Sequence, residues 1–281
     1  MRCYLFIQTE LEKRSRLGNL RPKKMKNSAF ILGLIGTMVF AHQPVMDMAP
    51  RWNGGYGFQV RYERFGSDRT IHEQNILSSY FQQTYWLEGV YTWHRAKRIT
   101  FKLPYHMIER QDADLVAKAN SFGDLILAVP LKKYSNFKRR TQNFGFTPQI
   151  RIPLNEEITS ASGYLGGGIS LSYSSESFSF YQLYDVFGWM YNEKDPLLGL
   201  DINLGIHPYH DNTTNTGLFA MWDVTGRWQE TSTRILTGPV FMTYRQNIMV
   251  RLDVKLPMVE NGKKTQLSKG LFMNVGIGLV F

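Results

Sequence analysis

The sequence predicts an all-β chain whose strands close into an antiparallel up-and-down β-barrel that spans a membrane. From residue 55 onward, side chains alternate between apolar and polar almost without interruption, which is the pattern of strands with two different faces. The alternating runs extend over roughly ten to fourteen residues, whereas soluble strands usually have about five or six and membrane-spanning strands need about 9–11. The mean hydropathy of −0.29 is too low for a helical membrane protein but suits a barrel with a polar interior.

The chain begins with a predicted secretory leader over residues 1–41. A lysine-rich start precedes the apolar run 29–40, and Val39-Phe40-Ala41 places compact residues before a cleavage point after Ala41. The run has about 12 residues and a membrane-spanning helix needs roughly 20, so a signal peptide is favoured over the alternative of an N-terminal anchor helix. The sequence favours Met25 as the true start.

Removal of this leader changes the charge argument. The whole chain carries a net charge of +10, but residues 1–41 hold eight Lys or Arg and two Glu, which leaves a mature chain near +4. The basic balance is therefore no indication of nucleic-acid binding. The single cysteine, Cys3, also lies in the leader, which excludes disulfides, a lipid-modified N-terminal cysteine and thiol catalysis in the mature protein.

Residues 42–54 are predicted to form a short N-terminal periplasmic segment. Cleavage would expose the amine and imidazole of His42, which can chelate copper, and Met46 and Met48 are soft donors suited to Cu(I). The plainer interpretation is an unstructured lead into the first strand. Another group, His207-Pro208-Tyr209-His210-Asp211, is better explained as a polar turn than as a metal site.

Twelve strands are then predicted in the barrel segment 55–281. They cover 55–65, 81–94, 98–109, 122–133, 142–154, 164–174, 177–190, 198–207, 217–229, 234–244, 246–257 and 270–281. In each strand one parity is apolar or aromatic, as in Leu198, Leu200, Ile202 and Leu204, and aromatic residues at the ends of these faces suggest two interfacial girdles. A two-layer sandwich is the alternative. Short turns alternate with longer connections at 66–80, 110–121, 155–163 and 258–269, although 134–141, 208–216 and 230–233 do not fit this alternation.

The opposite parity carries charged residues and is predicted to face the lumen. Six of these residues are basic and seven acidic, so no cation or anion preference is expected, and mutual pairing would narrow the pore. Four that lie close together in the sequence, Asp223, Arg227, Arg251 and Asp253, are predicted to narrow the lumen by pairing across strands. The predicted channel-lining residues are Arg61, Glu63, Glu88, Lys102, Asp124, Arg151, Asp185, Asp201, Asp223, Arg227, Arg251, Asp253 and Lys255.

The last strand, 270–281, alternates over its whole length and ends on Phe281. A long apolar strand with a free edge is a liability for a soluble protein, but a barrel removes the edge by pairing its last strand with its first. A terminal strand of this kind resembles the C-terminal strand of bacterial outer-membrane proteins. The resemblance implies that Phe281 is an assembly signal for the barrel-assembly machinery and that the protein lies in the outer membrane of a Gram-negative cell.

One short motif carries a family resemblance. In Ser121-Phe122-Gly123-Asp124-Leu125, a Gly-Asp pair precedes an apolar strand. With the repeated amphipathic strands and the terminal Phe281, it resembles the MetA-pathway phenol-degradation family of outer-membrane transporters. The resemblance covers about 55–281 and implies a channel for small, often hydrophobic or aromatic compounds. The plainer role for Asp124 is a lumen carboxylate that bonds a neighbouring Lys or Arg.

These observations together predict a diffusion channel for small, hydrophobic or aromatic molecules, with membrane lipid, the assembly machinery and the cargo as partners and no cofactor. Two alternatives remain: a sealed structural or adhesive barrel that acts through its loops, and copper handling through the N-terminal segment. A barrel enzyme is a weaker rival, because the sequence has no Gly-x-Ser-x-Gly and no recognisable Ser–His spacing. The run Gly166-Gly167-Gly168 lacks the following Lys-Ser/Thr of a phosphate loop.

Overall fold

The structure is a computed structural model that describes residues 55–71, 76–94, 96–112, 115–137, 140–154, 164–177, 179–193, 195–211, 213–230, 232–262, 265–267 and 270–281. The predicted leader, the segment 42–54 and the copper candidates His42, Met46 and Met48 lie outside these residues. No helix in the described part of the chain is long and apolar enough to cross a membrane.

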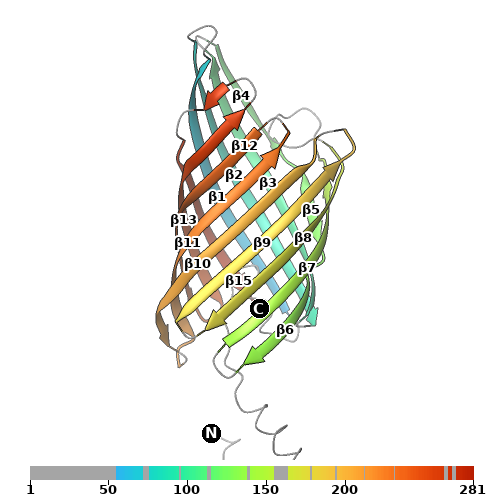
Figure 1. The fold of residues 1–281 in the computed structure, drawn as a ribbon, viewed down its shortest axis with the longest axis vertical. Helices are drawn as coiled ribbons and strands as arrows, with labels where there is room; N and C mark the ends of the chain where they lie inside the picture. The colour runs from blue at the N-terminus through green and yellow to red at the C-terminus, as the bar shows by residue number, and fades with distance from the viewer. Residues whose placement is uncertain are drawn as a thin grey trace, which may run out of the picture. The chain divides into compact units, whose positions relative to one another are not determined.

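The described residues form one antiparallel sheet that closes into a twelve-stranded barrel (Figure 1). Its strands are β1 (Gly55–Ile71), β2 (Ile76–His94), β3 (Lys97–Asp112), β4 (Leu115–Phe122), β5 (Leu125–Ala128), β6 (Leu131–Phe137), β7 (Arg140–Ile152), β8 (Gly166–Ser177), β9 (Phe180–Tyr191), β10 (Leu197–Asp211), β11 (Thr216–Gln229), β12 (Ser232–Arg245), β13 (Ile248–Gly262), β14 (Thr265–Leu267) and β15 (Phe272–Val280). The fourth barrel strand is divided into β4, β5 and β6, and the twelfth into β14 and β15. The predicted fold class and strand number are confirmed.

The barrel closes where the last strand pairs with the first. β15 runs antiparallel to β1 from Gly57↔Val280 to Phe65↔Phe272. Beyond the strand, the Phe281 N–H donates to the Tyr56 carbonyl at 2.7 Å, and the Tyr56 N–H donates to the Phe281 carbonyl at 3.2 Å. Closure satisfies the backbone groups that an edge strand would expose, as a membrane-spanning sheet requires. We call the end with Gly55 and Phe281 the turn end, and the opposite end the loop end.

Alternation along each strand separates an apolar outer wall from a polar interior. On β1, Tyr56, Phe58 and Val60 are 54, 46 and 60% exposed, whereas the intervening Gln59 is only 4% exposed. The same exposure of large apolar side chains recurs around the wall, for example at Leu204, Trp222 and Ile277. An exposed apolar surface of this extent needs a lipid environment.

Several predicted loops are instead strand. β1 and β2 continue to Ile71 and from Ile76, β3 and β4 reach Asp112 and Leu115, and β13 reaches Gly262, so much of 66–80, 110–121 and 258–269 is paired backbone. The sequences of these segments show no regular alternation of apolar and polar residues, although their backbones still pair. Longer strands also remove two of the irregular connections: β6 ends at Phe137 with β7 starting at Arg140, and β10 ends at Asp211 with β11 starting at Thr216. Glu230–Thr233 remains a short connection at the loop end.

Candidate functional site in the lumen

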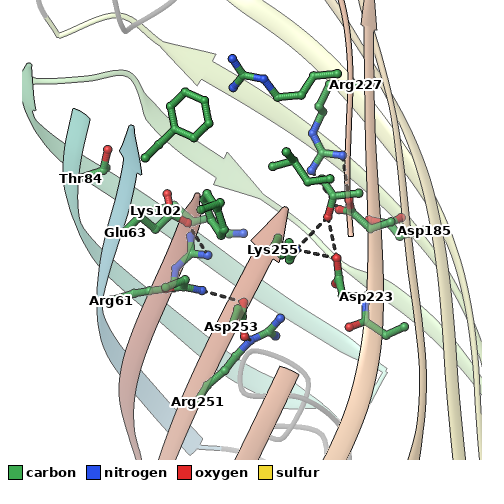
Figure 2. Close-up of a pocket in the computed structure, with 18 of the residues that line it drawn as sticks. Arg61, Glu63, Thr84, Lys102, Asp185, Asp223, Arg227, Arg251, Asp253 and Lys255 are labelled. Atoms are coloured by element: carbon green, nitrogen blue, oxygen red, sulfur yellow. Dashed lines mark hydrogen bonds and ion pairs between the residues drawn. The ribbon is translucent and has the colours of Figure 1, made fainter. Parts of the chain in front are cut away.

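The barrel encloses a cavity of about 520 Å³ that is lined by inward-facing side chains from most of its strands. Eleven of the thirteen predicted lumen residues line it; Asp124 and Arg151 do not. Figure 2 shows acidic and basic side chains that project toward one another from neighbouring strands. Sequence reasoning missed Arg234, which also lines this cavity and is the first residue of the predicted strand 234–244.

One ionic group joins β1 and β2. Arg61 forms ion pairs with Glu63 at 2.9 Å and with Glu88 at 2.8 Å, and its guanidinium lies 5.1 Å from the ring centre of Trp86. The Trp86 indole N–H donates to the other oxygen of Glu63 at 2.8 Å. Each carboxylate therefore has a charged partner, which offsets the cost of placing it inside the barrel.

The charges on β10 to β13 pair differently from the sequence expectation, which grouped Asp223, Arg227, Arg251 and Asp253. Arg227 instead donates two hydrogen bonds to Asp201 on β10, at 2.7 and 3.2 Å. Asp223 pairs with Lys255 at 2.6 Å. Only Arg251 and Asp253, on the same strand, pair within the expected group, at 2.7 Å. The expectation was wrong because it grouped residues by their distance along the chain. The closed sheet instead places β10 beside β11 and turns Lys255 of β13 toward β11.

Inward aromatic rings on β9 lie flat against glycines of the two neighbouring strands. Gly168 is the register partner of Trp189 and Gly199 that of Phe187, and an added Cβ would lie 2.7 Å from Trp189 and 2.1 Å from Phe187. Arg227 stacks over Phe187 at 4.6 Å. The glycine run 166–168, uncertain in the sequence, therefore makes room for aromatic side chains.

The Gly123-Asp124 motif is an irregularity within the fourth strand and not the start of it. Between the pairs Tyr105–Phe122 and Lys102–Ile126, this strand advances one residue more than β3, as in a β-bulge. A Cβ on Gly123 would lie 2.4 Å from the His106 ring. Asp124 is 4% exposed and lies 3.9 Å from Arg151, which agrees with the plainer role of an inner-wall carboxylate.

An apolar cluster inside the barrel has no counterpart in the sequence analysis. Its members are Tyr181, Phe219, Met221, Val240, Met242, Tyr244 and Met249, all at most 4% exposed. All seven have the inward parity and lie near the turn end of β9, β11, β12 and β13, where Tyr181 and Phe219 meet edge to face at 6.0 Å. The signal in the sequence is a run of apolar residues on both parities, as in Ile248-Met249-Val250.

Ser121 and His106 lie on neighbouring strands, but they do not form a hydrogen-bonded Ser–His–Asp relay. Ser121 and His106 are register partners, but the Ser121 hydroxyl donates to the Phe122 carbonyl at 3.0 Å. The His106 Nδ1 instead bonds with the Thr84 hydroxyl, also at 3.0 Å. No group of three or more potential metal ligands exists within the described residues.

A comparison with solved structures identifies the architecture. The chain aligns with the COG4313 outer membrane channel from Pseudomonas putida F1 at a TM-score of 0.61 and 12% identity, covering 87% of this chain and 99% of that one. The chain has the fold of an outer-membrane β-barrel. Its apolar outer wall places it in the outer membrane of a Gram-negative cell.

A second neighbour is the translocator domain of the autotransporter NalP from Neisseria meningitidis. It aligns at a TM-score of 0.45 and 11% identity, over 89% of this chain and 95% of that one, which is too distant to support a functional argument. No family model matches the sequence, and no curated protein matches it either.

Proposed function

We propose that this outer-membrane barrel is a diffusion channel for small molecules of low net charge, including hydrophobic and aromatic ones. The observation that carries the proposal is the lumen itself. A cavity of about 520 Å³ has most of its ionic groups in close pairs, with the apolar cluster nearer the turn end. Paired charges present no strong net field to a neutral solute.

The fold likeness to an outer membrane channel from Pseudomonas putida F1 supports this proposal. The motif around Gly123-Asp124 and the terminal Phe281 support the proposed relation to the MetA-pathway phenol-degradation family. The cavity lining includes eleven of the thirteen predicted channel-lining residues, and the contact of these residues with moving cargo is part of the proposal.

Transport by proteoliposomes tests this function. We expect phenol, as a neutral aromatic probe, to enter vesicles that contain the barrel faster than benzoate, its charged counterpart, and faster than it enters empty vesicles. Planar bilayers should show a small conductance that phenol reduces. Equal entry of phenol into loaded and empty vesicles, with no conductance, would contradict the channel.

A sealed barrel is the second candidate, and the complete burial of Phe219, Val240 and Met242 favours it. This alternative predicts no conductance and no solute entry while the protein remains folded. The copper alternative rests on residues outside the described part of the chain; titration of the mature N-terminus with copper tests it. Deletion of Phe281 tests the proposed assembly signal, because the yield of inserted barrel should fall while secretion continues.

A further inference from the structure

All charged residues in the segment between Leu125 and Leu154 are basic. The segment holds six basic residues and no Asp or Glu, and it contains β5, β6 and β7. Two of the six, Lys138 and Arg139, lie outside the described residues. Several basic residues in the lumen, such as Arg61, Arg227 and Lys255, have carboxylate partners on neighbouring strands, whereas this segment provides no carboxylate of its own.

Three exposed basic residues, Lys97, Lys133 and Arg140, lie on the outer wall near the turn end. We call them the basic patch. Lys97 pairs in register with Leu131, and Lys133 pairs with Phe144. β6 and β7 lie side by side at this end of the barrel (Figure 1).

The Arg140 side chain turns toward β8, on the other side of Phe144 from Lys133. Its guanidinium donates to the Ser175 hydroxyl and, at 3.3 Å, to the Tyr173 hydroxyl. Tyr173 is the register partner of Phe144, so Lys133, Phe144 and Tyr173 form one row across three strands. That row spans two interstrand spacings, roughly 10 Å, so Lys133 and the Arg140 guanidinium flank the exposed Phe144 and can contact one lipid head group that lies over this ring.

The patch has no carboxylate partner in the part of the chain that the structure describes. Within the described residues, no Asp or Glu lies within ion-pair distance of Lys97, Lys133 or Arg140. By contrast Lys118, an exposed lysine near the loop end, pairs with Glu109 at 3.1 Å. Adjacent cations without a counter-charge repel one another, so an external anion would stabilise this surface.

The apolar neighbours of the patch identify the kind of anion. Phe144 is 54% exposed, Phe146 is 40% exposed and Leu131 is 39% exposed, and these side chains continue into the lipid-facing wall. A soluble acidic protein would contact the cations but leave this apolar surface uncovered. A lipid with a phosphate head group satisfies both, because Arg and Lys bind phosphate oxygens and acyl chains cover the rings.

We propose that the basic patch binds the head group of an anionic phospholipid. Lys133 and Arg140 hold the phosphate, Lys97 adds a third positive charge nearby, and the acyl chains lie along Phe144 and Phe146. This site is on the outer wall and is independent of the proposed transport function.

Native mass spectrometry of the purified barrel, incubated with equal amounts of phosphatidylglycerol and phosphatidylcholine, tests the site. We expect phosphatidylglycerol to be retained preferentially, and the preference to fall as salt is raised. Lys133→Gln and Arg140→Gln should each weaken retention about fivefold, and the double variant about 25-fold, from the typical contribution of one basic residue at a membrane surface. Lys118→Gln is the matched control and should retain the parent preference.

Three results would overturn the assignment. They are equal retention of the two lipids by the parent protein, the same loss in Lys118→Gln as in Lys133→Gln, and Lys133-dependent binding of polyglutamate without a preference for phosphatidylglycerol. The last result would make the patch a docking surface for an acidic protein. A heat-modifiability gel shows whether each variant is folded, and the lipid and salt preferences of the parent test the site even if the double variant does not fold.

Discussion

The side of the lumen formed by β9 to β13 has an apolar half at the turn end and a charged half above it. The boundary is sharp on two of these strands: β11 passes from Met221 to Asp223, and β13 from Met249 to Arg251. In the apolar half, burial of apolar side chains provides most of the stabilisation, and specific polar contacts occur at its margin, where Tyr244 bonds with His210 at 2.9 Å and His207 lies against Phe219. In the charged half, each buried ion requires an opposite charge within ion-pair distance. The inward face of one strand therefore packs apolar side chains near the turn end and pairs ions farther along.

The two halves should therefore respond differently to the same chemical change. A carboxylate placed among the apolar side chains meets mainly apolar atoms, whereas one placed in the cavity meets basic groups and polar side chains. Substitutions that keep side-chain size constant separate this electrostatic effect from packing.

The largest effect is expected for Met242→Glu in the apolar cluster. Met242 is 0% exposed, and an unpaired buried charge should lower the free energy of unfolding by about 3–5 kcal/mol. Urea unfolding followed by tryptophan fluorescence in lipid or detergent measures it. The control Gln82→Glu lines the cavity and should cost less than about 1 kcal/mol; equal losses would show that the apolar cluster is hydrated.

An intermediate effect is expected for Asp253→Asn in the charged half. Asp253 is 2% exposed and accepts hydrogen bonds from Arg251 at 2.7 Å and from Asn274 at 2.9 Å. Loss of its charge should cost about 1.5–3 kcal/mol, the range for hydrogen bonds to charged groups. Met249→Leu, a swap of similar volume in the apolar half, should cost less than about 1.5 kcal/mol. The reverse order of these two losses would contradict the division of the lumen.

Ion selectivity should change when two arginines of the charged half are neutralised together. Arg227→Gln with Arg251→Gln leaves Asp201 and Asp253 without their nearest cations. If the channel conducts, the cation-to-anion permeability ratio should rise on the order of tenfold, because unmatched carboxylates concentrate cations in a narrow lumen. The reversal potential in a salt gradient measures this ratio. An unchanged reversal potential would place these residues outside the permeation path, and Lys118→Gln should leave it unchanged.

The smallest effect is expected at the turn that follows β10. The Thr214 hydroxyl at 2.6 Å and the Thr213 N–H at 2.8 Å donate to Asp211 and hold the pKa of this carboxyl below its ordinary value of 3.8. The stability from these bonds is therefore complete above pH 3.8 and is lost as the pH falls through the lowered pKa.

Thr214→Ala should raise the pKa of Asp211 toward its ordinary value, and a carboxyl titration by NMR measures this shift. Thr213→Ala keeps the backbone donor and should change the pKa less. A larger shift in Thr213→Ala than in Thr214→Ala would show that the hydroxyl of Thr214 is not the main cause.

The sequence by itself determined the barrel class, the strand number and the outward face of most strands. Leu204 and Ile206 could be assigned without any partner because the outer wall contacts one uniform apolar environment. A local period of two is then sufficient evidence. Where a strand shows no regular alternation of apolar and polar residues, as in the extensions of β1 and β2 toward the loop end, this signal is absent and the strand ends were misjudged.

Only the tertiary structure decided how the interior is organised. Parity predicted that Arg227 and Asp223 point inward, but their partners Asp201 and Lys255 were set by the order and register of strands in the closed sheet. The apolar cluster likewise brings Tyr181 of β9 beside Phe219 of β11, from strands that are not adjacent. Contacts in the lumen join residues of different strands, so they depend on how the barrel closes, on the register of its strands and on the position of each residue along the barrel axis. The local alternation of apolar and polar residues gives no information on these three features.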